Sequence, residues 1–353
     1  EAAHTPFMNV QDGFLTTHTV ESVLLIEPEL MREFVGHPQD KLMNLMDPAN
    51  PLMSGVVQNQ DSYMKGKIAQ RWYYDQVEPA LQEAFDEFQR KTGRRYGFVM
   101  PYRCEDAEYI LVGMGCYMET AQTTVDWLRS EKGIRAGCLN VHCFRPFPAT
   151  YIVDALKHAK AVTIIERMDD PLSTTGNHLT REIKAAFCDA VTGQGGQEPI
   201  NRVPKICHGA AGLGSRDVRP GDLYAIFENM REDAQDFFTV GIKHATALPV
   251  REDPDLRPPG AFSMRGHSVG GFGSVTTNKV IATIGGQVFG KDVQAYPKYG
   301  SEKKGLPTTY YLTVADTHIN MHCELEHVDL LCINDPTAIL AATIALVQTD
   351  FKR

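Results

Sequence analysis

The fold is decided by residues 109–143, which read YILVGMGCYMETAQTTVDWLRSEKGIRAGCLNVHC. The first four residues form an apolar run that ends in a glycine-bearing turn at 113–115. A segment of helical character follows over 119–132, and a second apolar run occupies 136–143. Short apolar runs that alternate with helices are typical of a mostly parallel sheet covered by helices on both faces. This stretch therefore predicts a strand, a helix and a second, parallel strand.

The same alternation continues toward the C-terminus. Further helices are predicted over 150–158, 179–190 and 220–230, and further strands over 161–165 and 203–207. We therefore expect residues 103–242 to form one α/β domain with a doubly wound parallel sheet. In such sheets, ligands lie beyond the carboxyl ends of the strands.

Two regions with other sequence patterns flank this domain. Residues 1–102 are irregular apart from one helix that stops near Gly93, and they are predicted to be the tail of a preceding domain. That helix has apolar residues at three- and four-residue steps, namely Tyr73, Val77, Leu81, Phe85 and Phe88. Residues 243–353 follow a proline-rich connection and are predicted to form a second α/β unit. Its expected elements are a helix over 275–284, strands over 293–296, 308–314 and 328–333, and an apolar helix-like segment to Val347.

Composition excludes several classes of protein. The 353 residues are 43% hydrophobic and 22% charged, which is ordinary for a soluble globular protein. A net charge of −9 argues against a nucleic-acid binder. No apolar run approaches the roughly 20 residues of a membrane helix, and no signal peptide is recognisable at the N-terminus. We expect a cytoplasmic chain that begins inside a longer polypeptide or is processed.

The cysteines and histidines predict no metal site. The eight cysteines include no Cys-x-x-Cys pair, whereas iron–sulfur modules hold their clusters with closely spaced thiolates. We expect mostly buried free thiols in a reducing compartment. The histidines lack ligand spacing; His318 and His322 are four residues apart, but in a segment predicted as a polar loop.

A glycine-rich stretch at 270–274 is the strongest candidate for a binding site. Small residues let a backbone approach an anion closely, and the N-terminus of the following helix offers N–H donors. Lys303 and Lys304 lie on another loop of the same unit, so both loops at one sheet edge would form a phosphate site. The alternative is a tight turn and a solvated lysine pair.

Two further turns are weaker candidates. The turn at 113–115, together with Glu119, is either a nucleotide-binding loop or a glycine turn that packs a helix against a strand. The turn at 145–148, RPFP, follows a strand and is either part of a ligand rim or a rigid turn. No nucleophile elbow and no pair of carboxylates in a catalytic frame is recognisable, so no catalytic residue is expected in this chain.

At several places the sequence resembles one family. Segments 12–18 (DGFLTTH), 110–115 (ILVGMG), 145–147 (RPF), 212–215 (GLGS) and 238–242 (FTVGI) are similar, in order, to motifs of the pyruvate:ferredoxin oxidoreductases, the 2-oxoacid:ferredoxin oxidoreductase family. The resemblance implies three parts. Residues 1–102 would end the pyrimidine-binding domain I, 103–242 would be a transketolase C-terminal-like domain II, and 243–353 would be part of a coenzyme A-binding, gamma-type domain III.

The resemblance also implies binding residues in the third part. The family's glycine-loop and S-K-K motifs fall on Gly273, Ser274, Val275, Asn278, Lys279, Ser301, Lys303 and Lys304. In the family these motifs belong to the coenzyme A-binding domain. The two lysines would be phosphate partners.

The family's reaction is the oxidative decarboxylation of a 2-oxoacid, here expected to be pyruvate, to acyl-CoA and CO₂. Electrons pass through iron–sulfur clusters to ferredoxin or flavodoxin, so the reaction belongs to electron transport. Thiamine diphosphate, Mg²⁺ and [4Fe-4S] clusters would be bound by parts outside this chain, and the chain alone is expected to be inactive. Its expected partners are the electron carrier, the remaining domains or subunits, and further copies in a homo-oligomer.

The sequence departs from the family at three positions of the third part. Phe272 stands where a small polar residue is usual, and Thr276 and Leu306 stand where glycine is usual. Bulky residues would narrow an anion site, and family members that act on oxalate use no coenzyme A. The alternatives are therefore a relative with altered or no coenzyme A use, or a non-catalytic assembly fragment.

Overall fold

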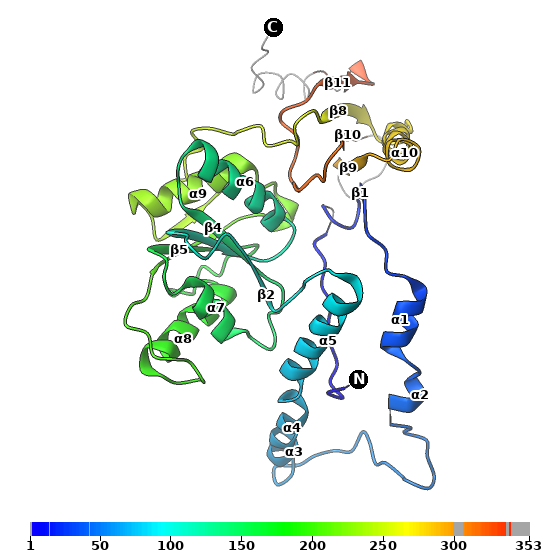
Figure 1. The fold of residues 1–353 in the computed structure, drawn as a ribbon, viewed down its shortest axis with the longest axis vertical. Coiled ribbons are helices and arrows are strands. Elements are labelled where there is room, and N and C mark those ends of the chain that lie inside the picture. Colours follow the sequence, from blue (N-terminus) through cyan, green and yellow to red (C-terminus); the bar gives the residue numbers. More distant parts are fainter. Residues whose placement is uncertain (1, 14, 42, 299–305, 337–338, 340–353) are drawn as a thin grey trace. The chain divides into compact units, whose positions relative to one another are not determined.

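The fold comes from a computed structural model, which describes residues 2–13, 15–41, 43–298, 306–336 and 339 (Figure 1). The chain divides into two compact units. The first contains Glu1–Val10 and Leu24–Phe98, and the second contains Gln11–Val23 and Val99–Arg353. Residues 11–23 therefore belong to the second unit, although the chain on either side of them belongs to the first.

The first unit is helical. Its helices are α1 (Pro28–Val35), α2 (Pro38–Lys41), α3 (Tyr63–Ala69), α4 (Arg71–Tyr74) and α5 (Val77–Thr92). Helix α5 ends where the sequence predicts, because Gly93 adopts the left-handed conformation (φ 72°) that closes a helix. Among the described residues of this unit, only Ala3 and Phe98 are buried apolar side chains. Part of the apolar face of α5 lines an open pocket of about 690 Å³.

The middle of the chain forms an open, six-stranded sheet in the order β2-β4-β3-β5-β6-β7. The strands are β2 (Val99–Tyr102), β3 (Tyr109–Gly113), β4 (Ala136–Val141), β5 (Ala161–Glu166), β6 (Lys205–Ala210) and β7 (Phe237–Thr239). All neighbours are parallel except β2 and β4. The predicted doubly wound α/β architecture is thus confirmed for this sheet.

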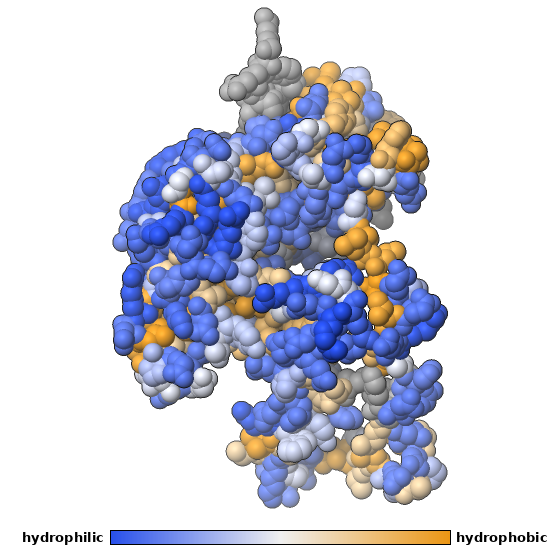
Figure 2. Space-filling model, viewed as in Figure 1, coloured by the Kyte–Doolittle hydropathy of each residue, from blue (hydrophilic) through white to orange (hydrophobic). Residues whose placement is uncertain are grey.

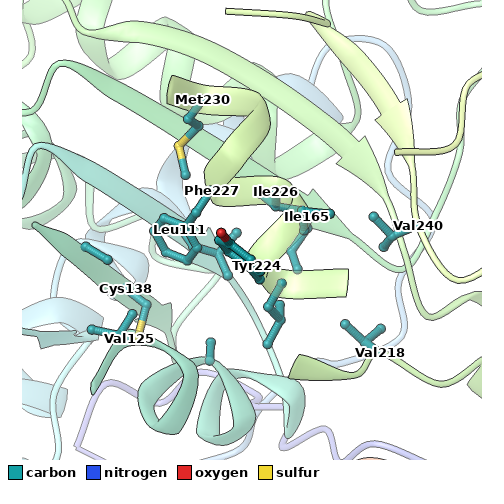
Figure 3. Packing of buried hydrophobic residues seen from close by; sticks show 14 of the residues in the cluster. Leu111, Val125, Cys138, Ile165, Val218, Tyr224, Ile226, Phe227, Met230 and Val240 are labelled. Carbon is teal, nitrogen blue, oxygen red and sulfur yellow. The ribbon is translucent and has the colours of Figure 1, made fainter. Parts of the chain in front are cut away.

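Helices cover both faces of this sheet. They are α6 (Tyr117–Glu131), α7 (Ala149–Leu156), α8 (His178–Thr192) and α9 (Pro220–Glu232), with a short 3₁₀ turn η1 (Leu213–Ser215) before α9. Buried side chains of α6 and α9 pack on one face, and those of α7 and α8 pack on the other. Figure 3 shows the first cluster, in which Tyr224 and Phe227 of α9 lie beside Leu111 of β3.

The C-terminal part forms a second, five-stranded sheet in the order β1-β9-β10-β8-β11. Its elements are β1 (Val20–Glu21), β8 (Phe262–Val269), α10 (Ser274–Gln287), β9 (Asp292–Lys298), β10 (Pro307–Ala315) and β11 (Leu330–Ile333). Strands β8 and β11 are parallel, whereas β10 is antiparallel to both β8 and β9. The sequence pattern did not predict β1 or β8.

Helix α10 lies on one face of this second sheet. Asn278 and Ala282 are its buried residues, and Ala282 packs in a cluster with residues of β8, β9 and β10. The opposite side of the helix is apolar and exposed, as Figure 2 shows over α10; the exposed residues are Val280, Ile281 and Ile284, followed by Val288 and Phe289. The helix is therefore apolar on both sides, but only one side is packed.

The other face of the sheet is covered by the segment between β10 and β11. We predicted a polar loop around His318 and His322, and for His322 this is wrong, because it is 7% exposed. Apolar side chains alternate along this segment and are buried: Ile319, Met321, Cys323 and Leu325. An extended chain with period-two alternation buries one side, even where it pairs with no strand.

Some predictions fall on residues that the structure does not describe. These are Ser301, Lys303 and Lys304, and most of the helix-like segment that we expected to run to Val347. Within the described residues, no helix has the length and apolar composition needed to cross a lipid bilayer. All eight cysteines are free; five are buried, as predicted, whereas Cys188 is exposed.

Candidate functional site

The glycine loop connects β8 to α10. Gly271 (φ 102°) and Gly273 (φ 80°) adopt left-handed conformations that residues with a Cβ rarely take. Gly273 is the N-cap of α10, and its carbonyl accepts the Thr277 N–H at 2.9 Å. The two glycines thus turn the chain tightly enough for the helix to begin directly above the end of β8.

Strand pairing brings other segments to the same sheet edge. The Gly270 N–H donates to the Leu306 carbonyl at 2.9 Å, and Pro307 pairs with Val269. Lys298, the last residue of β9, pairs with Thr309 of β10. The strands on either side of residues 299–305 therefore end beside the glycine loop. The predicted phosphate partners within that stretch lie outside the described residues.

A pocket of about 310 Å³ opens beside the glycine loop. It is lined by Ser268, Val269, Gly270, Gly271, Gly273, Ser274, Val275, Thr276 and Thr308. The Ser268 and Ser274 hydroxyls are hydrogen-bonded to each other at 2.7 Å. The first N–H groups of α10, at Ser274, Val275 and Thr276, have no acceptor within the described part of the chain. Hydroxyls and free N–H donors at a helix N-terminus suit a phosphate or carboxylate.

Of the predicted binding residues, Gly273, Ser274 and Val275 line this pocket, whereas Asn278 does not. Asn278 lies on the buried face of α10, and its Nδ2 donates to the Tyr311 carbonyl at 2.8 Å. Its Oδ1 has no hydrogen-bond partner in the described structure. The geometry therefore gives Asn278 an anchoring role, since it ties the second turn of α10 to the central strand β10.

The three departures from the family pattern differ in their effect on the pocket. The Phe272 side chain is 66% exposed, and Phe272 is not among the residues that line the pocket. Leu306 lies at the edge and contributes its carbonyl to Gly270. Only Thr276 is part of the pocket wall. The bulk at Phe272 therefore leaves the pocket open.

The turn at 113–115 is filled by the chain itself. The Asp12 carboxylate accepts the Cys116 N–H at 2.5 Å and pairs with the Arg167 guanidinium at 3.3 Å. Gly115 has a φ of 98°, and a Cβ there would lie 2.5 Å from Asp12 Oδ2. Burial, followed by the bond to Asp12, raises the pKa of the Cys116 thiol to about 12. A nucleotide phosphate at this turn would have to displace Asp12, so the geometry favours the structural alternative.

The turn at 145–148 is also held by its own contacts. The Arg145 guanidinium lies 4.3 Å from the centre of the Phe144 ring and forms an ion pair with Glu182 of α8. Both contacts hold the guanidinium against its own domain, as the rigid-turn alternative predicts.

An ion pair between the buried His322 and the partly exposed Glu119 connects α6 to the segment that covers the second sheet. His322 Nε2 lies 2.8 Å from Glu119 Oε2 and 3.9 Å from Glu21 Oε2. Burial would lower the pKa of His322, but the Glu119 and Glu21 carboxylates raise it above its usual value. Likewise, burial would raise the pKa of Glu119, and the bond to His322 lowers it. Sequence reasoning missed this pair, because the alternation of buried apolar residues at 319, 321, 323 and 325 would place His322 on the opposite side of the segment.

A second charged group surrounds a pocket of about 400 Å³ at the carboxyl ends of β6 and β7. Asp217 Oδ1 accepts the Glu324 N–H at 2.9 Å. Burial, and then the nearby Glu324 carboxylate, raise the pKa of Asp217 to about 7. Lys298 pairs with Glu324, and Arg219 pairs with Asp253 at 3.1 Å, whereas Arg216 donates to the Gly241 carbonyl at 2.7 Å. Among the described residues, no three His, Cys, Asp or Glu side chains gather as metal ligands.

Three family models match the chain in order. "Pyruvate flavodoxin/ferredoxin oxidoreductase, thiamine diP-bdg" matches residues 1–86, "Pyruvate:ferredoxin oxidoreductase core domain II" matches 107–223, and "Pyruvate ferredoxin/flavodoxin oxidoreductase" matches 263–350. The chain belongs to the pyruvate:ferredoxin/flavodoxin oxidoreductase family. The resemblance identified from the sequence motifs is thereby confirmed.

Some of the relatives are much longer than this chain. The pyruvate-flavodoxin oxidoreductase of Nostoc sp. is 29% identical over 318 residues, which are 87% of this chain and 26% of the relative. The pyruvate:ferredoxin oxidoreductase of Moorella thermoacetica is 28% identical over 344 residues, or 96% of this chain and 28% of the relative. The chain thus spans about a quarter of the length of these relatives.

Other relatives are separate subunits. The pyruvate synthase subunit PorA of Methanothermobacter thermautotrophicus is 32% identical over 238 residues, or 67% of this chain and 57% of the relative. The solved structure of the pyruvate oxidoreductase subunit PORC of Thermotoga maritima is 27% identical over 22% of this chain and 39% of that one, with a TM-score of 0.19.

Proposed function

We propose that this chain is a three-part section of a thiamine diphosphate- and iron–sulfur-dependent 2-oxoacid:ferredoxin or flavodoxin oxidoreductase. The enzyme decarboxylates a 2-oxoacid, with pyruvate as the expected substrate, and transfers the acyl group to coenzyme A. The observation that carries the proposal is the order of the family matches, which cover residues 1–86, 107–223 and 263–350.

Within that enzyme, the glycine-loop pocket is the proposed binding site for the phosphate end of coenzyme A. The free N–H groups at the start of α10 and the hydroxyls of Ser268, Ser274 and Thr308 are suitable partners for a phosphate. Ser301, Lys303 and Lys304 complete the site in this proposal, because β9 and β10 bring both ends of their loop to the pocket. Asn278 supports the site by anchoring α10.

The redox cofactors fit less well to the described residues. Iron–sulfur clusters need several thiolates close together. Among the described residues, the cysteines form no group of this kind, and five of them are buried. We therefore assign the clusters, Mg²⁺ and the catalytic residues to parts of the enzyme beyond this chain, whereas residues 1–86 match the family's thiamine diphosphate-binding domain. The chain's partners in the proposal are those parts and the electron carrier.

The proposal is tested on the complete enzyme that contains this chain. Purified enzyme is supplied with pyruvate, thiamine diphosphate and Mg²⁺, and the reduction of ferredoxin is followed with and without coenzyme A. We expect reduction that depends on coenzyme A, together with formation of acetyl-CoA. Reduction without coenzyme A would instead support the alternative with no coenzyme A use, and no reduction with any 2-oxoacid would support an assembly role.

A binding experiment tests the coenzyme A site separately. Lys303→Ala and Lys304→Ala each remove one charge-assisted phosphate contact, so we expect each to weaken coenzyme A binding by roughly 1.5–3 kcal/mol in calorimetry. Lys243→Ala, at an exposed lysine in the loop after β7, is the matched control and should leave the affinity unchanged. Equal affinity in all three variants would remove the two lysines from the site.

A further inference from the structure

Phe272 is an exposed aromatic residue on the tip of the glycine loop. Both of its neighbours, Gly271 and Gly273, line the pocket, whereas Phe272 does not. Its side chain is 66% exposed, so the ring is not used for packing within the described part of the chain. The ring is thus attached to the rim of the pocket and is available to a ligand.

The volume of the pocket bears on the role of the Phe272 ring. A volume of about 310 Å³ lies at the lower end of the range of small-molecule sites, roughly 300–1,000 Å³. Its hydroxyls and the free N–H groups of α10 suit a phosphate, which leaves the other parts of a nucleotide-like ligand outside. A base that lies outside the pocket needs a flat apolar surface, and Phe272 offers one at the rim.

We propose that Phe272 is a specificity-determining residue that stacks on the adenine ring of coenzyme A while the phosphate end occupies the glycine-loop pocket. This inference rests on the proposed function, because it takes coenzyme A as the ligand. The two flanking glycines lack side chains that would crowd the ring, so Phe272 can approach the base without moving β8 or α10. Stacking of a base on an aromatic side chain is tolerant of the base but requires a π-face.

The test compares two probes that differ in the adenine-bearing part. Binding of coenzyme A and of 4′-phosphopantetheine, which lacks the adenosine portion, is measured by calorimetry on the full chain. For Phe272→Ala we expect coenzyme A to bind roughly 5- to 100-fold more weakly, which corresponds to the loss of one stacked base. Binding of 4′-phosphopantetheine should change less than about twofold, on the same reasoning.

Two further variants control the result. Phe289→Ala removes an equally exposed phenylalanine, 67% exposed, that follows the end of α10, and it should leave both affinities unchanged. Phe272→Trp preserves a π-face, so it should retain the affinity for coenzyme A, and its fluorescence should be quenched on binding. Because both phenylalanines are exposed, thermal melting should show that all three variants remain folded.

The outcomes separate this inference from the proposal on which it rests. If the wild-type chain binds coenzyme A and Phe272→Ala binds it equally well, the stacking role is wrong and the coenzyme A site stands. Equal weakening of both probes also overturns the inference, because Phe272 would then act on the part that they share. If the wild-type chain binds no coenzyme A, the coenzyme A site fails, and the stacking role fails with it.

Discussion

Asp217 shows how a single residue couples protonation to structure. Its Oδ1 accepts the Glu324 N–H at 2.9 Å, so the carboxyl group joins the loop before α9 to the segment that covers the second sheet. Burial and the neighbouring Glu324 carboxylate raise its pKa from 3.8 to about 7. The Arg219 guanidinium acts in the opposite direction, but its charge is shared with Asp222, Asp253 and Glu326.

Asp217→Asn should therefore change how stability depends on pH. A raised pKa means that the folded state holds the proton more tightly than the unfolded chain does. The stabilisation of the folded state by this proton is complete below the usual aspartate pKa of 3.8, and it is lost as the pH rises through about 7. Asparagine stays neutral and preserves the acceptor. Between about pH 4 and pH 8, the free energy of unfolding of the variant should therefore fall by about 1–3 kcal/mol less than that of the wild type.

The measurement is the free energy of unfolding from denaturant titrations across this pH range. Asp217→Ala is the matched variant: it is also neutral and should share the flatter pH profile, but it leaves the partly buried Glu324 N–H without its acceptor. It should therefore be about 1–3 kcal/mol less stable than Asp217→Asn at every pH. Parallel pH profiles for the wild type and Asp217→Asn would contradict the prediction.

At the scale of elements, residues 11–23 connect parts of the second unit, although residues of the first unit separate them from the rest of the second unit along the chain. At one end, Asp12 caps the start of α6 and pairs with Arg167. At the other end, β1 pairs with the edge strand β9, with Val20 opposite Ala295. One short segment therefore contacts both sheets. A carboxylate at the positive end of α6 is favoured by the helix dipole as well as by the hydrogen bond.

Asp12→Ala should loosen the first turn of α6. The change removes the acceptor of the Cys116 N–H and leaves the Arg167 guanidinium without its carboxylate, so we expect a loss of about 1–3 kcal/mol in the free energy of unfolding. Asp12→Asn preserves an acceptor and should cost less. Hydrogen exchange at the start of α6 measures the local effect.

Asp61→Asn, at an exposed carboxylate of the first unit, is the control for a general effect of charge. Unchanged exchange in the first turn of α6 in Asp12→Ala would show that the cap is dispensable.

At the scale of the whole molecule, the two sheets of the second unit are joined by polar contacts along α6. Glu119 pairs with His322, the His322 N–H donates to Thr120 Oγ1 at 2.8 Å, and the Thr123 hydroxyl donates to the Asn320 carbonyl at 2.7 Å. Directional contacts of this kind fix one arrangement of the sheets, because a shifted arrangement would leave buried donors without acceptors.

Glu119→Gln should weaken this junction in a pH-dependent way. The pKa of His322 is raised above its usual value of 6.5, so the ion pair contributes fully below about 6.5 and is lost as the pH rises through the raised value. Because the Glu119 side chain is 43% exposed, solvent screens part of the interaction. We therefore expect the variant to lose about 0.5–1 kcal/mol near pH 6 and clearly less near pH 9, where the wild-type imidazole is neutral.

Thermal unfolding at the two pH values, read by circular dichroism, measures the difference. Glu131→Gln, an exposed glutamate at the end of the same helix, should behave as the wild type does. A loss for Glu119→Gln that is equal at both pH values would argue that Glu119 acts only by packing.

The alternation of strands and helices along the middle of the chain followed from the sequence by itself. Buried strands such as Tyr109–Gly113 and Ala161–Glu166 are nearly continuous apolar runs, and glycines stop the helices between them, so local pattern was sufficient. The glycine loop at 270–274 could likewise be recognised, because the requirement for residues without a Cβ is local. The family followed from motifs that occur in the right order.

Tertiary structure alone decided which distant groups meet. Strand β8 is rich in polar residues, and its neighbours β10 and β11 make it a strand; β1 has only two residues and exists through its pairing with β9. The burial of His322 and the placement of Asp12 at α6 depend on residues about 200 and 100 positions away, which no short sequence window contains. Local periodicity reports which side of an element is apolar, whereas the partner of a charged group is set by how the chain returns on itself.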